Sequence, residues 1–218
     1  MKEYTIKIEI ESPTLLGSGE GWGSIIDSDI AFDKLGLPYF PAKRLKGLLR
    51  ESAQEVIEMF KEAGIDISLN VDDLFGKPGQ KESTPVFFPD LYLAEYAEIK
   101  KWLEWALNEH SHILSNEVIT GTLTETRQQT AISEKGIAKP HSLRTIRVLK
   151  PGYFFEGKIK IKNEDVQLIN LLALACINLR HVGTRRNRGF GRISCVLMDG
   201  ENKLGSQFLD GLQEAKDV

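Results

Sequence analysis

The first stretch of the chain alternates between apolar and polar positions. Tyr4, Ile6, Ile8 and Ile10 are separated by charged or hydroxyl-bearing residues, and Pro13 follows shortly after. A hydrophobic period of two is typical of a strand with one buried face. We therefore expect a strand over residues 4–10, followed by a glycine-rich loop over residues 17–23.

The pattern then changes to steps of three and four. From Leu45 to Phe60 the apolar positions follow this spacing, which predicts an amphipathic helix that starts near Pro41 and ends at Gly64. Residues 84–89 resemble a short edge strand, because prolines stand at both of its ends. Beyond it, Asp90 is expected to cap a helix that runs to about residue 114.

That second helix carries Trp102 and Trp105, which we expect to pack in its apolar stripe. Residues 120–140 are polar, contain Gly121, Gly136 and Pro140, and show no sustained period. They predict an extended loop or a long irregular hairpin, and long loops in compact domains are often functional.

The strongest periodic signal lies in the C-terminal part. It predicts a strand over residues 153–162, a cap at 163–165, a helix to residue 181 and a strand over 191–198. Together with the first half this is an α+β, ferredoxin-like βαββαβ core. We expect one domain over residues 1–200, with a helical insertion at about 90–115, a loop at 120–147 and a tail at 201–218.

Composition narrows the class of protein. The 218 residues are 41% hydrophobic and 27% charged, with two cysteines, so the core needs no disulfide or metal to hold it. The longest apolar run, at residues 171–177, is far shorter than a membrane span. With no apolar leader at the N-terminus, we expect a cytoplasmic protein without a membrane partner.

Charge is distributed unevenly along the chain. Residues 127–192 hold 14 Lys/Arg and 4 Asp/Glu, whereas the remainder holds 14 and 27, which accounts for the net charge of −3. Such segregation favours a basic surface for a polyanion. The alternative is a solvated lysine face, with Lys158, Lys160 and Lys162 along one strand.

Two basic segments look suited to phosphate. Residues 183–192 combine glycines, which allow close backbone approach, with four arginines, whose forked donors match phosphate oxygens. Neither a Walker loop nor a Rossmann fingerprint fits this order of elements. The first turns of the helix that starts near residue 41 are also basic. The helix dipole disfavours cations at this end, which indicates that these cations meet an anion. The alternative for the first segment is a glycine-rich hairpin with exposed arginines.

Carboxylates and histidines supply the candidates for chemistry. Asp27, Asp29 and Asp33 follow one another at short steps and could hold a divalent cation or position a 2′-hydroxyl for attack on a phosphodiester. Alternatively, Asp29 and Asp33 merely solvate a strand edge. Among the four histidines, His141 alone lies in a suggestive setting, the basic segment with Arg144 and Arg147.

Three segments together resemble one family. Residues 27–50 contain Gly36-Leu37-Pro38 and Leu45-Lys46-Gly47, which look like the signature of the RAMP superfamily of CRISPR-associated proteins. Residues 86–90 resemble the short strand ending in Asp that follows in that family, and residues 183–191 resemble its C-terminal glycine-rich loop. Where the family usually has small residues, this chain has Ala42-Lys43-Arg44.

The resemblance implies an RNA-recognition-like (RRM-like) core that binds guide RNA in a type III effector complex of antiviral defence. It further implies a thumb-like hairpin at residues 120–147, target RNA and other effector subunits as partners. The implied RNA-binding residues are Lys43, Arg44, Lys46, Arg50, Arg127, His141, Arg144, Gly183, Arg185, Arg186, Arg188, Gly189 and Gly191.

The resemblance also leaves the enzymatic role open. As in cleaving backbone subunits, Asp27 would act in metal-dependent target-RNA cleavage, with Mg²⁺ as cofactor, through attack of a 2′-hydroxyl on the adjacent phosphate. Alternatively, the chain is a scaffold subunit without catalysis that binds the guide end or caps the complex. A third possibility is a standalone guide-processing endoribonuclease that uses His141.

Overall fold

The computed structural model describes residues 1–17, 29–65, 70–77, 85–162, 165–183 and 189–205. Its elements, in chain order, are β1 (Lys2–Ile10), α1 (Ala42–Glu62), α2 (Val71–Phe75), β2 (Val86–Phe87), β3 (Tyr92–Leu93), α3 (Tyr96–Glu109), α4 (Asn116–Leu123), β4 (Thr124–Gln129), β5 (Arg144–Leu149), β6 (Phe154–Ile161), α5 (Val166–Asn178), β7 (Ile193–Asp199) and β8 (Asn202–Lys203).

The main sheet has the strand order β2-β6-β1-β7-β8, and β3 also pairs with β6. Every pairing in it is antiparallel. Counting only β1, β2, β6 and β7, this is the order of a βαββαβ ferredoxin-like sheet, with α1 and α5 as the two crossover helices. The α+β, ferredoxin-like expectation is therefore confirmed.

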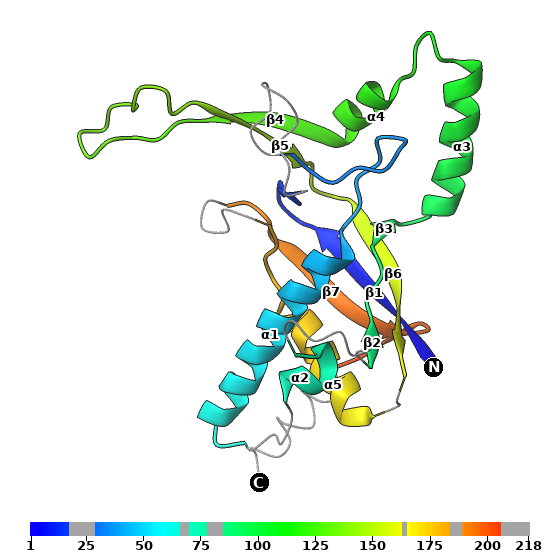
Figure 1. The fold of residues 1–218 in the computed structure, drawn as a ribbon, viewed down its shortest axis with the longest axis vertical. Helices are drawn as coiled ribbons and strands as arrows, with labels where there is room; N and C mark the ends of the chain where they lie inside the picture. The colour runs from blue at the N-terminus through cyan, green and yellow to red at the C-terminus, as the bar shows by residue number, and fades with distance from the viewer. Residues whose placement is uncertain (18–28, 66–69, 78–84, 163–164, 184–188, 206–218) are drawn as a thin grey trace.

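Strand β1 lies in the middle of this sheet and shows the predicted alternation. Ile6, Ile8 and Ile10 are fully buried, whereas Lys7 faces outward and pairs with Glu156 across the strand. The buried face of β1 packs under α1 and α5, which lie on one side of the sheet (Figure 1). The apolar positions that alternate in β1 and those spaced by three and four in α1 therefore face the same core.

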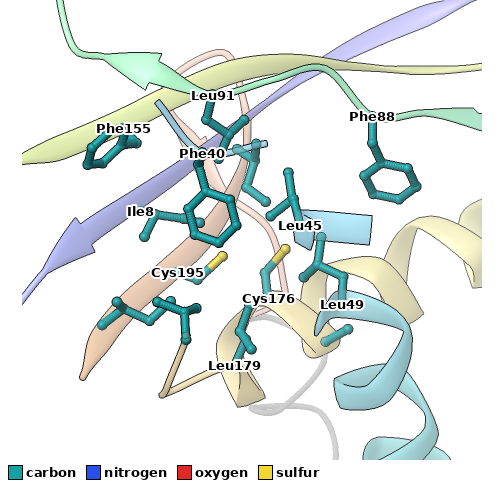
Figure 2. Close-up of a cluster of buried hydrophobic side chains, with 14 of the residues drawn as sticks. Ile8, Phe40, Leu45, Leu49, Phe88, Leu91, Phe155, Cys176, Leu179 and Cys195 are labelled. Carbon is teal, nitrogen blue, oxygen red and sulfur yellow. The ribbon is translucent and has the colours of Figure 1, made fainter. Parts of the chain in front are cut away.

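Helix α5 is buried on most of its circumference, since eight of its 13 residues are buried. Figure 2 shows Cys176 of α5 and Cys195 of β7 side by side below Phe40 and Ile8. Both thiols are free and buried, and the hydrogen bond with Cys176, together with burial, raises the pKa of Cys195. The cysteines therefore belong to the apolar core.

No helix in the described part of the chain is long and apolar enough to cross a membrane.

An insertion between β3 and β6 leaves the compact core. It contains α3, α4 and the two-stranded β4–β5 sheet, a long hairpin that reaches away from the molecule (Figure 1). The hairpin expected between residues 120 and 147 is thus present, while α4 and the short strand β3 were not expected. Strand β8, from the residues expected in the tail, pairs with the end of β7.

Two local expectations were wrong. Asp90 does not cap the helix that follows it, because α3 begins only after Glu95, which has a φ of 62°. Its Oδ1 instead accepts a hydrogen bond of 2.7 Å from the backbone N–H of Ala42, at the start of α1. Trp102 and Trp105 do not pack inward, since 69% and 51% of their surfaces are exposed.

Candidate nucleic-acid interface

A short segment, residues 14–17, joins the elements that the sequence analysis marked as RNA-binding. Thr14 and Leu149 exchange two backbone hydrogen bonds, of 3.0 and 2.8 Å, at the base of the hairpin. A Cβ atom on Gly183 would overlap the carbonyl group of Leu15, and one on Gly17 would lie 3.8 Å from Nη2 of Arg44. Residues 14–17 therefore lie beside the base of the hairpin, the start of the glycine-rich loop at residue 183 and the start of α1.

The start of α1 carries exposed cations. Lys43 and Arg44 are exposed and Lys46 is half-buried, and none of the three forms an ion pair within the described residues. The first turn contains no acidic residue. The carboxylate of Asp90 accepts a hydrogen bond from the backbone N–H of Ala42, the first residue of the helix. Free cations and a helix N-terminus together form an environment that favours a phosphate group.

Arg50, in contrast, already has protein partners. Its Nη2 pairs with the carboxylate of Asp72, and its Nη1 donates to the carbonyl oxygen of Gly76. Both partners belong to α2 or its C-terminal cap. In this structure Arg50 holds α2 against α1, so it contributes less free charge to the surface than its three basic neighbours.

The glycine-rich loop is described only at its two ends. Gly183 and Gly191 have φ angles of 79° and 77°, and a Cβ on Gly191 would overlap the carbonyl oxygen of Val182. These two glycines therefore allow close contact with the chain itself. Gly189, at a φ of 76°, has open space at its Cβ position and is exposed. Arg185, Arg186 and Arg188 lie outside the described residues.

The hairpin contacts the glycine loop through Arg127. Its guanidinium group lies 5.6 Å from the ring centroid of Phe190, and its Nη2 pairs with Glu125 at 2.6 Å. Arg144 faces the same side of the hairpin, because it pairs with Gln129 two positions beyond Arg127, and it is exposed. The β4–β5 stem therefore extends the cationic surface away from the core.

His141 lies near the far end of the hairpin, after the last residues of the turn. It is exposed and has a φ of 55°. Within the described residues its imidazole makes no hydrogen bond or ion pair, so no neighbouring group fixes its tautomer or orientation.

Asp29 and Asp33, which follow the glycine-rich residues 17–23 in the sequence, both have partners within the protein. Asp29 is buried, with only 2% of its side chain exposed, and accepts from Nη1 of Arg147 at 3.0 Å. Asp33 accepts from the backbone N–H groups of Leu35 and Leu37 and from the hydroxyl of Tyr96 at 2.7 Å. Neither carboxylate lies at a solvated strand edge, so that alternative was wrong.

Asp27, the candidate catalytic and metal-binding residue, lies outside the described residues. Both ends of its segment belong to the interface, because Gly17 forms a β-bridge with Ile30. Within the described ranges, no group of three or more His, Cys, Asp or Glu residues could hold a metal ion.

A pocket of about 730 Å³ opens behind the hairpin base. It is lined by the segment from Asp29 to Tyr39, by α4, by the first residues of β4 and by Arg147. Arg147 forms part of its wall, with its guanidinium 5.8 Å from the ring centroid of Phe32. The sequence analysis missed this pocket, since its residues come from three distant segments and form no linear motif.

Comparisons with known proteins identify the family and the fold of the chain. The family model described as the RAMP superfamily matches residues 7–194. No curated protein sequence matches the chain. Among solved structures, the chain is similar to a chain of the type III-B Cmr-beta complex bound to cognate target RNA, with a TM-score of 0.64 and 11% identity, covering 90% of this chain and 97% of that one. A chain of the Cmr-beta complex in its apo state gives a TM-score of 0.62 at 13% identity, covering 88% and 96%.

Proposed function

Because this chain belongs to the RAMP superfamily, we propose that it is a guide-RNA-binding subunit of a type III CRISPR effector complex. The observation that carries the proposal is the convergence at residues 14–17. Residues 14–17 lie beside Leu149 at the hairpin base, Gly183 at the start of the glycine-rich loop, and Arg44, which has no ion-pair partner among the described residues. A similar fold occurs in a Cmr-beta complex that was solved with target RNA.

The proposed contacts are to the RNA backbone. Lys43, Arg44 and Lys46 would bind phosphate oxygens at the start of α1, and Arg144 would continue the contact along the hairpin. The arginines at 185, 186 and 188 would add donors from the glycine loop. Phosphate contacts position an RNA without reading its bases, so the affinity should depend little on sequence.

Salt-dependent RNA binding tests the proposal. The double variant Lys43→Ala/Arg44→Ala removes two phosphate contacts, so the log–log slope of affinity against salt should become shallower by about 1.4. The matched control is Lys158→Ala/Lys160→Ala on β6, where both lysines pair with Glu3. Equal losses in the two variants would show a general charge effect and would contradict a specific site at α1.

We further propose target-RNA cleavage at Asp27. The observation that favours it is that the segment containing Asp27 begins after Gly17, beside Arg44, and ends before Ile30, which forms a β-bridge with Gly17. In the proposed step a 2′-oxygen attacks the adjacent phosphorus, Asp27 takes the hydroxyl proton, and the 5′-oxygen leaves and takes a proton from water. The products would be a 2′,3′-cyclic phosphate and a 5′-hydroxyl.

Cleavage by the assembled complex in the presence of Mg²⁺ tests this second proposal. Asp27→Ala should abolish the cyclic-phosphate product while guide binding stays unchanged. Unchanged cleavage would support the scaffold role, in which the subunit holds or caps the guide without cutting. The guide-processing alternative predicts cleavage of precursor RNA by the isolated chain, and loss of that activity in His141→Ala.

A further inference from the structure

A pocket lies on the helical side of the molecule, between α1 and the end of α5. Its volume is about 370 Å³, at the lower end of the range for ligand pockets. The two helices lie side by side (Figure 1), and the hydroxyl of Ser52 joins them by donating to the carbonyl oxygen of Ala175 at 2.8 Å. The pocket is lined by residues 48, 51, 52 and 55 of α1 and by residues 178–181. We call it the helical pocket.

The helical pocket adjoins the proposed path of the RNA backbone on two sides. Leu48 and Glu55 follow Arg44 at steps of four and eleven, so all three share one face of α1. Leu48 is one turn from Arg44, about 6 Å along the helix axis. On the other side, the chain that follows α5 leads directly to Gly183, where the glycine-rich loop starts. A nucleotide whose phosphate contacts Arg44 therefore has the pocket within reach of its own base or that of its neighbour.

Hydrogen bonds between side chains fix one wall of the helical pocket. Nδ2 of Asn178 donates to Oγ of Ser52 at 3.1 Å and to Oε2 of Glu55 at 2.9 Å. Ser52 is buried. Within the described part of the chain, Oδ1 of Asn178 and Oε1 of Glu55 accept no hydrogen bond. These two oxygens are acceptors on neighbouring side chains, and the hydrogen bond between those side chains holds them in place for a ligand.

Charged groups of both signs line the helical pocket. Glu51 and Glu55 are exposed on α1, and Arg180 and His181 are exposed after the end of α5. A site of mixed charge selects neither a free phosphate nor a simple cation. It fits a neutral ligand that carries both donors and acceptors and has an apolar face to lie against Leu48. A nucleobase has these properties.

Guanine matches these groups better than the other three bases. Its Watson–Crick edge carries two adjacent donors, N1–H and the N2 amino group, which no other base has on that edge. The two donors are complementary to Oε1 of Glu55 and Oδ1 of Asn178. An arginine is the usual partner of guanine O6 and N7, and Arg180 supplies the guanidinium group for them.

We therefore propose that the helical pocket binds one guanine base of the RNA that the subunit holds. The proposal rests on the RNA-binding function proposed above and adds base recognition to it. Phosphate contacts carry no sequence information, so a preference for guanine at one nucleotide has to come from a separate site. A free guanine nucleotide presents the same edge, and the experiment separates these two sources.

Binding of short single-stranded RNAs to the chain tests the proposal. Oligouridine is the reference, and guanosine, adenosine, cytidine or inosine replaces one uridine at each position in turn. Guanosine at the recognised position should raise the affinity about tenfold, in the range expected for one bidentate base contact. Adenosine and cytidine should give no such gain. Inosine should lose most of it, because inosine lacks the N2 amino group.

Two matched variants of α1 locate the preference in the helical pocket. Glu55→Ala removes one of the two acceptors, so the gain from guanosine should disappear. Glu58→Ala is the control, because Glu58 is also an exposed glutamate of α1 but lies outside the pocket. It accepts a hydrogen bond from the side-chain amide of Gln54 at 3.0 Å, much as Glu55 accepts from Asn178. Glu58→Ala should keep the full preference for guanosine.

Guanosine 5′-monophosphate distinguishes a base within RNA from a free nucleotide. If the base belongs to bound RNA, the mononucleotide should bind far more weakly than the guanosine-containing RNA, because it lacks the neighbouring phosphate contacts. A mononucleotide that binds as tightly as the RNA would assign the pocket to a free nucleotide and would overturn the proposal.

Two results of the RNA series would also overturn the proposal. All the RNAs could bind equally, or the preference for guanosine could persist in Glu55→Ala. Neither result touches the proposed function, because the salt slope and its change in Lys43→Ala/Arg44→Ala report on phosphate contacts alone. Absence of binding to every RNA would instead contradict the proposed function and this proposal together.

Discussion

Asp90 caps helix α1 from a position 48 residues further along the chain, with its Oδ1 accepting from Ala42 N at 2.7 Å. The residue that normally fills this role, the N-cap, is Pro41, whose side chain makes no capping bond. This hydrogen bond therefore connects the segment between β2 and β3, which contains Asp90, to the start of α1. Lys43 and Arg44 follow directly after it.

Replacement of Asp90 should reveal this cap. Asp90→Ala should lower the free energy of unfolding by about 1 kcal/mol, the usual cost of losing an N-terminal cap. Asp90→Asn keeps an acceptor oxygen and should lose only part of this free energy. Urea unfolding measures the free energy of unfolding of both variants, and Asp73→Ala, at an exposed position, is the control. Equal effects of Asp90→Ala and Asp73→Ala would show that the bond contributes nothing to stability.

The pair Asp29–Arg147 predicts a larger effect. Arg147→Ala leaves the carboxylate of Asp29, 2% exposed, without its cation, and should cost about 3–5 kcal/mol of unfolding free energy. The double variant Asp29→Asn/Arg147→Met removes both charges and should be more stable than Arg147→Ala alone. Denaturant titration measures the free energy of unfolding of both variants. If Arg147→Ala were the more stable of the two, a buried unpaired charge would not be the cause of its lost stability.

Two glycines in one loop form a matched pair for testing backbone overlap. Both Gly189 and Gly191 have positive φ angles, of 76° and 77°, so an alanine at either carries the same left-handed strain of about 1–2 kcal/mol. In addition, the new methyl group at 191 would overlap the Val182 carbonyl oxygen, whereas at 189 it meets open space. Gly191→Ala should therefore lower the melting temperature clearly more than Gly189→Ala.

Alkaline pH should weaken the contact between Tyr96 and Asp33. Burial, followed by the hydrogen bond to Asp33, raises the pKa of Tyr96 above its ordinary value of 10.0. A raised pKa means that the folded state keeps the proton more tightly, so this stability is complete below pH 10 and is lost as the pH rises further. Unfolding free energies measured from pH 8 upward should fall more steeply in the wild type than in Tyr96→Phe. Parallel curves would contradict the assignment.

The core elements could be predicted from the sequence because their signals are local. The alternation in β1 and the three-and-four spacing in α1 reflect one buried face each, which the chain records position by position. The cap at Asp165 likewise lies next to the helix that it caps, where it accepts from Gln167 and Leu168. In these places sequence neighbours are also structural neighbours.

The site could be predicted less completely because its decisive contacts are long-range. Nothing near Asp29 in the sequence indicates that Arg147, 118 residues away, neutralises it. Asp90 looked like the cap of the next helix, while its partner lay 48 residues earlier. The tryptophans of α3 fit an apolar stripe by spacing, but the inner positions of that helix already fill the space over the core.

The position of β1 determines when the fold can be completed during synthesis. This strand is made before the other strands of its sheet, yet its partners are distant in the sequence. Lys2 pairs with Ile161 of β6, and Ile10 pairs with Ile193 of β7. Both partners emerge from the ribosome only after the whole α3–hairpin insertion. The nascent chain therefore carries β1 as an unpaired apolar strand until β6 has been made, and contacts of such wide sequence separation are slow to form.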